Sequence, residues 1–377
     1  MKKNFMALVC AGLLGMLSAF TASAQTNVTL YGLVDYGYTY RFDGRGLGGN
    51  GGTPSSQSQL NGGQSAENRI GFKGTEDLGN GLKALFTLEQ GFNIDTGDQY
   101  QSNKQFSRQA YVGLSGDFGT VIGGRLYTPH YQFVSSIDPF RAGTIGSYRN
   151  VYSPASALTN YGTLTDPINV DNAVSYTSPT WNGVTGTVFY SNNVVGQEAS
   201  ASNSGNNTLY GGLVKYETGP IMVGLNYHFG AAGTNNPGLK ETQSTSLGGT
   251  YDFKVAKVAA LYSYNTVAYN VAGSGDAILN NYLIGVTAPY GKWTGKASYQ
   301  YSDGNRSAGG DAQQLAVGVD YNLSKRTAFY TAYSWIDNSN QRYNAVGDAS
   351  NSGGYTGNGY TAGVFQQGVQ AGIRHAF

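Results

Sequence analysis

Four segments of the chain alternate between two kinds of residue with a period of two. They are residues 221–229 (IMVGLNYHF), 245–254 (TSLGGTYDFK), 293–302 (WTGKASYQYS) and 314–323 (QLAVGVDYNL). Successive side chains of an extended strand point to opposite faces, so each segment has one largely apolar face and one polar face. The apolar faces offer 20 positions, and none of them carries a charge. Because a lipid-facing Arg or Lys at mid-bilayer costs roughly 2 to 4 kcal/mol, the pattern predicts strands with one face in lipid and the other along a polar lumen.

A soluble β-sandwich would also alternate, because one face of each of its sheets packs against the other sheet. The positions of the aromatic residues distinguish the two architectures. Tyr227 and Phe229 lie at the end of one segment, and Tyr299 and Tyr301 lie at the end of another. Such positions are typical of the aromatic girdles at membrane interfaces, whereas a sandwich core would place its large residues in mid-strand. The pattern therefore favours a membrane β-barrel.

The N-terminal segment has the three parts of a secretory signal peptide. Lys2 and Lys3 precede an apolar stretch over residues 5–20, which small residues follow up to Ala24. We predict a signal peptide over residues 1–24 and a barrel domain over residues 25–377. The apolar part is shorter than the ~20 residues that a spanning helix needs. Cys10, the only cysteine, lies within it, so the mature chain is expected to have no disulfide, no thiolate metal site and no cysteine nucleophile.

The composition of the mature chain excludes two further classes. No run of 18 apolar residues follows residue 24, so helical membrane spans are excluded. Without Lys2 and Lys3, 21 basic residues stand against 22 acidic ones. This near-neutral balance gives no support to a nucleic-acid partner, which would need a strongly basic patch.

The connections between the alternating segments predict a closed all-β fold. Every second connection is short, whereas the others are long and polar, such as residues 44–63, 191–207 and 337–359. An even number of strands, with both termini on the short-turn side, is what a closed antiparallel transmembrane barrel requires. About sixteen strands would leave an aqueous channel. The sixteen predicted strands are residues 27–40, 66–74, 81–91, 105–115, 119–126, 171–178, 183–190, 208–217, 221–229, 245–254, 257–266, 279–288, 293–302, 313–323, 326–336 and 363–377.

The chain ends in the alternating segment AGIRHAF, residues 371–377. Termini are normally poorly ordered unless something holds them. We expect this last strand to pair with residues 28–38, because an unpaired edge in lipid leaves backbone groups unsatisfied at roughly several kcal/mol each. Phe377 is then expected in the periplasmic aromatic girdle, Arg374 on the lumen side and His375 on the lipid side.

Residues 127–170 form the longest stretch without strand alternation. Structureless loops longer than roughly 12 to 15 residues are usually functional or disordered. This stretch carries Tyr131, Phe133, Ile137, Pro139 and Phe140, and it is not of low complexity. We therefore expect it to fold inward and narrow the pore, with an external lid or adhesive loop as the alternative.

Six segments spread over the whole mature length carry a resemblance to a known family: VTLYGLVDYGY (28–38), NRIGFKGTEDLGNGLKALFTLEQGF (68–92), FSRQAYVGLSGDFGTVIGGRLYTP (106–129), SIDPF (136–140), DNAVSYTSP (171–179) and the terminal GIRHAF. With these segments the chain resembles the trimeric sixteen-stranded porins of Gram-negative outer membranes, most closely those of the beta-proteobacterial type. The resemblance implies passive diffusion of ions and small hydrophilic solutes across the outer membrane, a homotrimer and a third external loop folded into the lumen. It also implies that the outer-membrane assembly machinery recognises the terminal aromatic, here Phe377.

The resemblance also suggests pore-constriction residues. Arg69 matches the family's constriction arginine at the start of the second strand, and its parity with Gly71 and Lys73 points it to the lumen. Arg108 matches a second family arginine, although strict alternation would turn it outward; a bulge or a position above the lipid would reconcile the two. Where the family often has a further arginine, this chain has Asn169-Val170-Asp171, which puts strong anion selectivity in doubt and leaves a weak anion preference.

Other charged residues have the parity or place of pore-lining groups, since charged rings and loop dipoles decide which ions pass a narrow pore. Asp138 and Arg141 in the long loop are expected to form the wall that faces the arginines. The remaining candidates for the lumen are Lys83, Lys254 and Lys296 among the basic residues, and Asp35, Glu89, Asp252 and Asp320 among the acidic ones. For each of these, a solvated side chain without a selective role is the alternative.

Enzymatic and cofactor-dependent functions find no support in the sequence. His130, His228 and His375 are the only histidines, and they lack metal-ligand spacing. No paired Ser and His emerges from the strands, and the glycine-rich residues 44–49 lack the strand-turn-helix context of a phosphate loop. We therefore expect no enzyme, no cofactor and no metal.

Two further functions remain open beside a general diffusion porin. One is a barrel that serves mainly as a surface adhesin or immune target through its external loops. The other is a substrate-specific channel, for which the sequence displays no saturable site. Reversal potentials and loop deletions would separate these functions.

Overall fold

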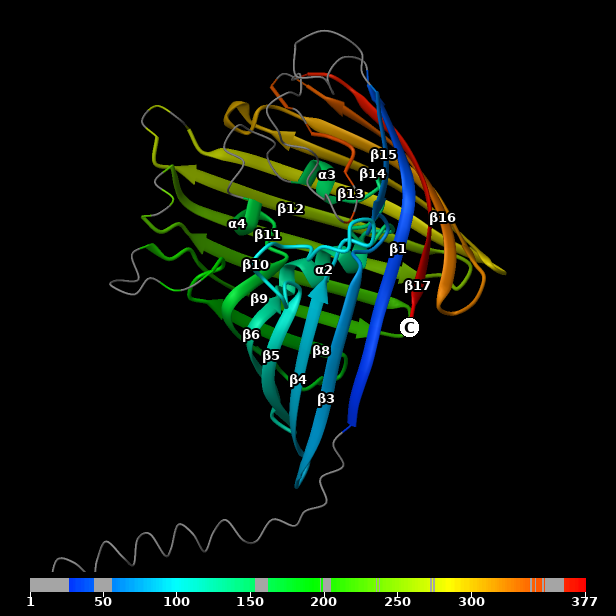
Figure 1. Cartoon of the computed structure of the whole chain (residues 1–377). Coiled ribbons are helices and arrows are strands. Elements are labelled where there is room, and N and C mark those ends of the chain that lie inside the picture. Colours follow the sequence, from blue (N-terminus) through cyan, green and yellow to red (C-terminus); the bar gives the residue numbers. More distant parts are fainter. Residues whose placement is uncertain are drawn as a thin grey trace, which may run out of the picture.

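The alternating segments all become strands of one antiparallel sheet that closes on itself (Figure 1). The structure, a computed structural model, describes residues 27–43, 56–152, 162–196, 198, 205–234, 236, 238–271, 273, 275–339, 341–342, 344–347, 349 and 363–377. The predicted signal peptide, residues 1–24, lies outside the described residues. Within the described part of the chain, no helix is long and apolar enough to cross a membrane.

The sheet accounts for most of the ordered elements. Its strands are β1 (Asn27–Asp43), β2 (Ser56–Gly62), β3 (Arg69–Gly79), β4 (Leu82–Gly91), β5 (Gln109–Gly116), β6 (Gly119–Tyr127), β7 (Asn169–Thr177), β8 (Val184–Ser191), β9 (Thr208–Thr218), β10 (Ile221–Ala231), β11 (Leu239–Asp252), β12 (Lys257–Tyr269), β13 (Ala277–Tyr290), β14 (Trp293–Gly304), β15 (Ala312–Asn322), β16 (Thr327–Asn338) and β17 (Gln366–Ala376). The helices are α2 (Pro129–Ile137), α3 (Arg149–Tyr152), α4 (Gly162–Thr165) and the 3-10 helix η3 (Arg306–Ala308).

The described strands occupy sixteen positions in the barrel wall, because β2 and β3 share one position beside β1. The first half of β1 pairs with β3, from Asn27 opposite Thr75 to Leu33 opposite Arg69. Its second half pairs with β2, from Tyr36 opposite Gly62 to Phe42 opposite Ser56. From β3 onward each strand pairs with the next, and β17 returns to pair with β1. The predicted sixteen-stranded closed barrel is confirmed.

The prediction that residues 44–63 form a loop was wrong for residues 56–62, which are β2. The polar sequence SQSQLNG gave little sign of a strand. It is extended because β1 runs on past β3 and offers it a partner. Between β2 and β3 the chain leaves the wall, and the Asp35 carboxylate accepts hydrogen bonds from the backbone N–H groups of Gln64, Ser65 and Ala66, at 3.2, 3.0 and 3.0 Å.

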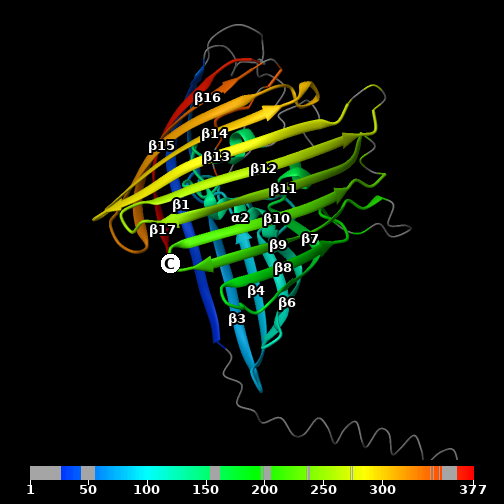
Figure 2. The same ribbon diagram turned by 180° about the vertical axis from the view of Figure 1, so that it is seen from behind.

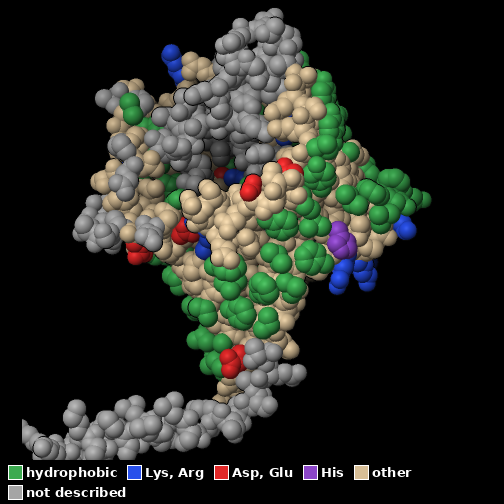
Figure 3. All heavy atoms as spheres, in the orientation of Figure 1, with side chains coloured by type: hydrophobic (Ala, Val, Ile, Leu, Met, Phe, Trp, Pro, Cys, Tyr) green, Lys and Arg blue, Asp and Glu red, His purple; other side chains and the backbone are tan. Residues whose placement is uncertain are grey.

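The predicted lipid and lumen faces are confirmed by exposure. Val223, Leu225 and Leu247 are 43%, 50% and 51% exposed, although they lie in mid-strand. Their neighbours of opposite parity, such as Asn226 and Ser246, are fully buried inside the barrel. Apolar side chains accordingly gather over the outer wall in the space-filling view (Figure 3). A polar inside and an apolar outside exclude a soluble sandwich.

Both ends of the barrel wall meet at the short-turn end, as a view from behind also shows (Figure 2). The N–H group of Gly32 donates to the Phe377 carbonyl and the N–H group of Phe377 donates to the Gly32 carbonyl, both at 3.1 Å. The Phe377 ring lies over Gly32 on the outer face and remains 44% exposed. His375 faces outward, where its Nδ1 lies 2.8 Å from the Thr327 hydroxyl. Arg374 faces inward and donates to Ser65 and Asp320, so the predicted parity of the last strand is confirmed.

Replacing Gly32 by valine is expected to displace the Phe377 ring and lower the melting temperature of the folded barrel. A Cβ at this position would meet the ring and would lie 2.7 Å from the Arg69 carbonyl oxygen. Overpacking of this kind costs ~1 to 3 kcal/mol. The matched control is Gly295→Val, which is also on the outer face of a strand and whose nearest neighbour, the Ala288 carbonyl oxygen, is 3.9 Å away. If a heat-modifiability assay shows the same fall in melting temperature for both variants, the close contact of Gly32 with the Phe377 ring does not contribute to stability.

Candidate functional site

Residues 128–152, the described first part of the long segment between β6 and β7, pack against the inner face of the wall. Thr128 caps α2, because its hydroxyl accepts a hydrogen bond from the N–H group of Tyr131 at 3.1 Å. Phe133, Val134 and Ile137 of this helix are almost fully buried. Residues 133–140 then lie along the inner face, where four wall glycines leave room for them: Gly224 faces Phe133, Gly248 faces Ile137, Gly285 faces Pro139 and Gly318 faces Phe140. A Cβ at any of these positions would strike the loop.

Asp138 shapes the turn that follows α2. Its carboxylate is 2% exposed and accepts hydrogen bonds from the backbone N–H groups of Phe140, Ala142 and Tyr148, at 3.0, 2.9 and 3.1 Å. Burial raises the pKa of Asp138 to about 6, against the opposing effect of these hydrogen bonds. Asp138, predicted at the constriction, is therefore buried within the loop, whereas Arg141 next to it is exposed and has a positive φ of 54°.

A second loop, between β16 and β17, also packs inward. The Arg41 Nε donates to the Val346 carbonyl oxygen at 2.7 Å, and the Asn344 amide donates to the Asn150 carbonyl oxygen at 2.7 Å. Arg342 is buried and donates to the Val151 carbonyl oxygen at 3.0 Å; burial lowers its pKa to about 10. Residues 337–359 were predicted as a long polar loop of the kind that is mobile on the surface, but the described residues 341–342, 344–347 and 349 pack inward. Asn and Gly are typical of surface loops, but here Asn344 donates to the backbone of the first loop and the Gly347 N–H group donates to the Asn150 side chain.

Arg108 forms an ion-pair cluster with two carboxylates. It pairs with Glu67 and, at 2.7 Å, with the Oε1 atom of Glu89, and it also donates to the Tyr127 hydroxyl. Tyr31 donates to the other oxygen of Glu89 at 2.8 Å. Arg108 precedes the first residue of β5, so the alternation of that strand does not apply to it and its side chain turns inward. Neither a bulge nor a position beyond the lipid is needed to explain its direction.

A second cluster surrounds Asp171, at the place where the family often has an arginine. Asp171 accepts from Arg125 at 2.6 Å and from Lys104 at 2.5 Å. Sequence reasoning missed Arg125, which lies where a register shift between Gly124 and Leu126 interrupts the alternation of β6. Asp171 therefore stands where the family often has an arginine, and it also offsets the charge of Arg125.

Arg69, Lys73 and Lys83 differ from these paired cations. Arg69 opens β3 opposite Leu33 and Gly91. Lys73 lies four residues further along the same face, with its Nζ 5.3 Å from the centroid of the Tyr31 ring. Lys83 lies on β4 opposite Asp77. Within the described ranges none of the three makes an ion pair, and the two lysines are exposed.

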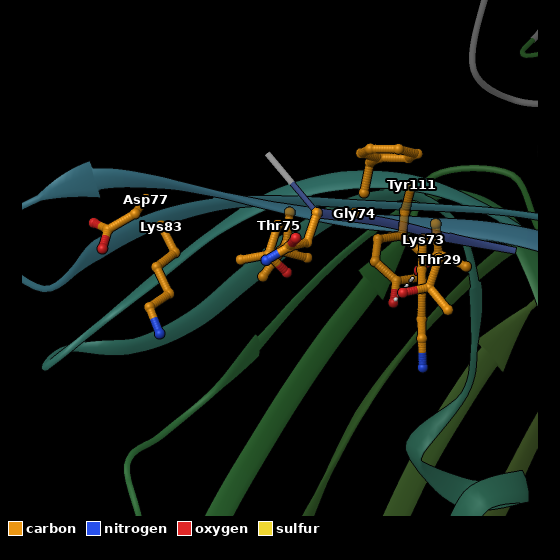
Figure 4. A pocket seen from close by; sticks show the side chains of 11 residues that line it. Thr29, Lys73, Gly74, Thr75, Asp77, Lys83 and Tyr111 are labelled. Atoms are coloured by element: carbon orange, nitrogen blue, oxygen red, sulfur yellow. Dashed lines mark hydrogen bonds between the residues drawn. The ribbon is translucent and has the colours of Figure 1, made fainter. Parts of the chain in front are cut away.

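Lys73 and Lys83 line a hollow of about 620 Å³ near the short-turn end of the barrel. In Figure 4 both lysines extend to the same side of the strands as Thr29 and Thr75, while the Asp77 carboxylate turns away from the Lys83 ammonium group. Asp77 is the only carboxylate among the described residues that line this hollow. The hollow is therefore a site of net positive charge with several hydroxyl groups.

Other predicted lumen charges are neutralised or lie elsewhere. Asp320 pairs with Lys296 at 2.8 Å and with Arg374 at 2.9 Å. Asp35 is buried and is engaged by the Tyr330 hydroxyl at 2.7 Å as well as by the backbone. Lys254 lies in the short turn after β11, which ends at Asp252, so its predicted place on a lumen-facing strand was wrong. In the described part of the chain, no group of three or more His, Cys, Asp or Glu residues is arranged to hold a metal ion.

Comparison with known proteins identifies the family. The model of the Gram-negative porin family matches residues 7–341. The chain belongs to this family of porins. It is 34% identical to Outer membrane porin protein 32 of Delftia acidovorans over the full length of both chains. It is 33% identical to an outer membrane porin of Bordetella pertussis, with 90% of this chain and 95% of that one covered. The barrel matches an anion-selective porin from Comamonas acidovorans with a TM-score of 0.77 at 31% identity, covering 94% and 100% of the two chains.

The family membership settles the place and the general function of the protein. It is an outer-membrane porin that forms a channel for passive diffusion of ions and small solutes. Porins act without catalysis, which agrees with the lack of enzymatic motifs in the sequence. These relatives do not favour the alternative of a barrel that acts mainly as an adhesin.

Replacing Asp138 by asparagine is expected to loosen the turn after α2. The amide offers one acceptor oxygen to three backbone donors, and an unsatisfied buried group costs ~1 to 3 kcal/mol. Hydrogen exchange at Phe140, Ala142 and Tyr148 should therefore accelerate, whereas Asp117→Asn, in the exposed turn between β5 and β6, should leave it unchanged.

The same residue predicts a pH dependence. Because the pKa of Asp138 is raised to about 6, the packed loop binds this proton more tightly than the unfolded loop does. Its contribution to loop stability is thus fully present below the ordinary pKa of about 4 and is lost as the pH rises through about 6. After correction for intrinsic rates, exchange at these amides should increase over that interval in the wild type and lose this dependence in Asp138→Asn. A dependence that persists in the variant would contradict the assignment.

Proposed function

We propose that this porin is a general diffusion channel with a weak preference for anions. The observation that carries the proposal is the contrast between paired and unpaired cations on the inner face. Arg108, Arg125, Lys296 and Arg374 each lie against a carboxylate. Arg69, Lys73 and Lys83 do not, and their positive charge is available to ions in the passage.

The spacing of these three cations supports attraction of anions along the whole row. Arg69 and Lys73 are four residues apart on one face of β3, which corresponds to ~13 Å along the strand. Lys83 continues the row toward the short-turn end through the hairpin between β3 and β4. Successive charges are separated by little more than a Debye length of about 8 to 10 Å, so the row attracts anions along this part of the wall. The relative from Comamonas acidovorans is described as anion-selective.

Asp171 and the buried carboxylates limit the preference. Asp171 lies between Arg125 and Lys104 and offsets one of their two positive charges, and Glu67 and Glu89 together outweigh Arg108. The proposed selectivity is consequently weak, so the channel passes both ions and small hydrophilic solutes.

We place the constriction between the segment 128–152 and the wall that carries Arg69. The contacts of Phe133, Ile137, Pro139 and Phe140 with inner-face glycines support this placement. Arg141 is exposed at the turn of this segment and adds a cation to the passage. Asp138 acts from within the turn by fixing the direction of the backbone that presents Arg141.

The export and assembly of the protein are proposed from its membership of the porin family. We propose that residues 1–24 are removed on export, that three copies associate in the outer-membrane lipid and that Phe377 is recognised by the assembly machinery. The exposed ring of Phe377 at the closing seam supports the last step, since it is available before the final strand is in place. A trimer is named for one solved structure of similar fold, an outer membrane protein of Vibrio cholerae at 17% identity.

Conductance across a planar bilayer tests the function directly. Folded, heat-modifiable protein should insert in steps that each comprise three equal conductances. A protein that folds and inserts without ohmic conductance would overturn the proposal.

Selectivity is tested by reversal potentials in a gradient of potassium chloride. Arg69→Gln, Lys73→Gln and Lys83→Gln should each shift the reversal potential toward the cation-selective value, and the shifts should add in the triple variant because the sites share no partner. Lys254→Gln, an exposed lysine in a turn at the same end of the barrel, is the matched control and should leave the potential unchanged. If the triple variant behaves like the control, these residues do not set the selectivity.

A further inference from the structure

Two of the three histidines meet where the segment 128–152, here called the constriction segment, touches the wall. His130 is on α2 and His228 is on β10, and both are fully buried. Their rings are 4.7 Å apart between centroids and stand at 74° to one another. They are 98 residues apart in the chain without metal-ligand spacing, and the function proposed above uses neither.

The hydrogen bonds of His130 indicate that both of its ring nitrogens carry a proton. Its Nε2 lies 3.2 Å from the Oδ1 atom of Asp166, and its Nδ1 lies 3.3 Å from the Oδ1 atom of Asn226. The orientation of Asn226 is fixed, because its amide nitrogen donates to the Gly212 carbonyl oxygen at 2.9 Å. Both nitrogens of His130 therefore face acceptors, which suits an imidazolium and not a neutral ring.

The partners of His228 indicate the opposite state. Its Nε2 lies 3.2 Å from the carbonyl oxygen of Leu164, to which it donates a hydrogen bond. Its Nδ1 is buried and has no partner among the described residues. A proton on Nδ1 would have no acceptor, so the geometry fits a neutral imidazole with one N–H group.

The remaining groups around the pair leave it with little further negative charge. Asp166 also accepts from Arg149 at 2.5 Å and from the Tyr148 hydroxyl at 3.0 Å. Burial alone would raise the pKa of Asp166, but the Arg149 guanidinium and His130 lower it well below its usual range. The Tyr152 ring lies 5.7 Å from His130, and its hydroxyl bonds Ser246 of β11. The Asp166 carboxylate thus pairs with both Arg149 and His130, and no other carboxylate named here lies beside the pair to balance a third positive charge.

We infer that His130 and His228 hold a single positive charge between them and that this state fastens the constriction segment to the wall. The charged ring ties α2 to Asp166 and to Asn226 of β10. The neutral ring ties the Leu164 carbonyl of α4 to β10. His228 is accordingly a positioning residue for the pore, which acts through the loop and touches no solute.

A second proton on the pair, bound by His228, would release the constriction segment from the wall. It would place two like charges about 5 Å apart in a buried space where charge–charge interactions are weakly screened, and it would sit on a nitrogen without an acceptor. The loop can relieve this repulsion by leaving the wall. Because the inference rests on the proposal that this segment narrows the passage, release should appear as transient closures of the channel.

The experiment records single-channel current from about pH 7 to about pH 4, the range that spans the ordinary titration of histidine and below. The wild type should show roughly tenfold more closures at the acid end, the change expected from ~1.4 kcal/mol of lost fastening. His228→Gln retains an amide donor for Leu164 but cannot take up a proton. It should conduct normally at about pH 7 and lack the acid-induced closures. His375→Gln, which removes the histidine on the outer surface, is the matched control and should behave like the wild type.

The protonation states can also be observed without conductance. The mature chain has three histidines, so nitrogen-15 labelling of histidine gives three ring signatures, and His375→Gln removes the outer one. At about pH 7 one remaining ring should be doubly protonated and the other neutral with its proton on Nε2. Two rings in the same state would overturn the inference even if the channel proves weakly anion-selective. Acid-induced closures that persist in His228→Gln would also overturn it. Asp138 titrates over part of the same range, but its protonation favours the packed loop and therefore opposes the effect.

Discussion

The closure of the sheet between β1 and β17 is the interaction on which the rest of the structure depends. In lipid, a backbone N–H or C=O group without a partner costs roughly several kcal/mol, so an open edge would cancel the gain from the apolar outer face. The two strands pair continuously from Leu33 to Asp43, and the chain termini add reciprocal hydrogen bonds between Gly32 and Phe377. Closure of the sheet separates a lumen-facing side from a lipid-facing side, and because the lumen-facing side does not contact lipid, it can be polar. Every feature of the pore follows from that separation of faces.

The inner wall is shaped for the loops that it contains. Glycines on β10, β11, β13 and β15 face side chains of the segment 133–140, so the loop lies close to the wall and leaves space on its other side. The second inward loop then rests on the first, through Asn344 and Arg342. Polar side chains join the two loops to each other and to the wall, as Asn344 does to the Asn150 carbonyl oxygen and Arg41 to the Val346 carbonyl oxygen. The proposed constriction is therefore a unit of two loops packed on each other and on the wall.

Much of the fold could be predicted from the sequence, because a membrane barrel imposes its requirements on each residue in turn. The lipid excludes charge from one face, so the parity of Val223, Leu247 and Val317 was readable without a partner strand. The inward turn of Arg108 was not, because it depends on where β5 begins and on two distant carboxylates, Glu67 and Glu89. Strand β2 and the inward path of the described residues 341–342, 344–347 and 349 were missed for a related reason. Their polar composition is that of a surface loop, and only their partners, the extension of β1 and the first loop, show that they pack.

In the proposed function, pairing with a carboxylate separates the charges that stabilise the fold from those that act on solutes. A cation against a carboxylate contributes less net field at a distance, so Arg125 and Lys296 hold elements together while their charges are partly offset by Asp171 and Asp320. Sequence parity assigns all lumen-facing cations the same role, since it carries no information about what lies across the strand. The ion pairs separate a structural set from the available cations Arg69, Lys73 and Lys83, which lie on one hairpin, β3 and β4. The histidines follow the same rule within the loop. His130 is charged because Asp166 and Asn226 accept from it, and His228 stays neutral because the one nearby carboxylate is already shared with Arg149.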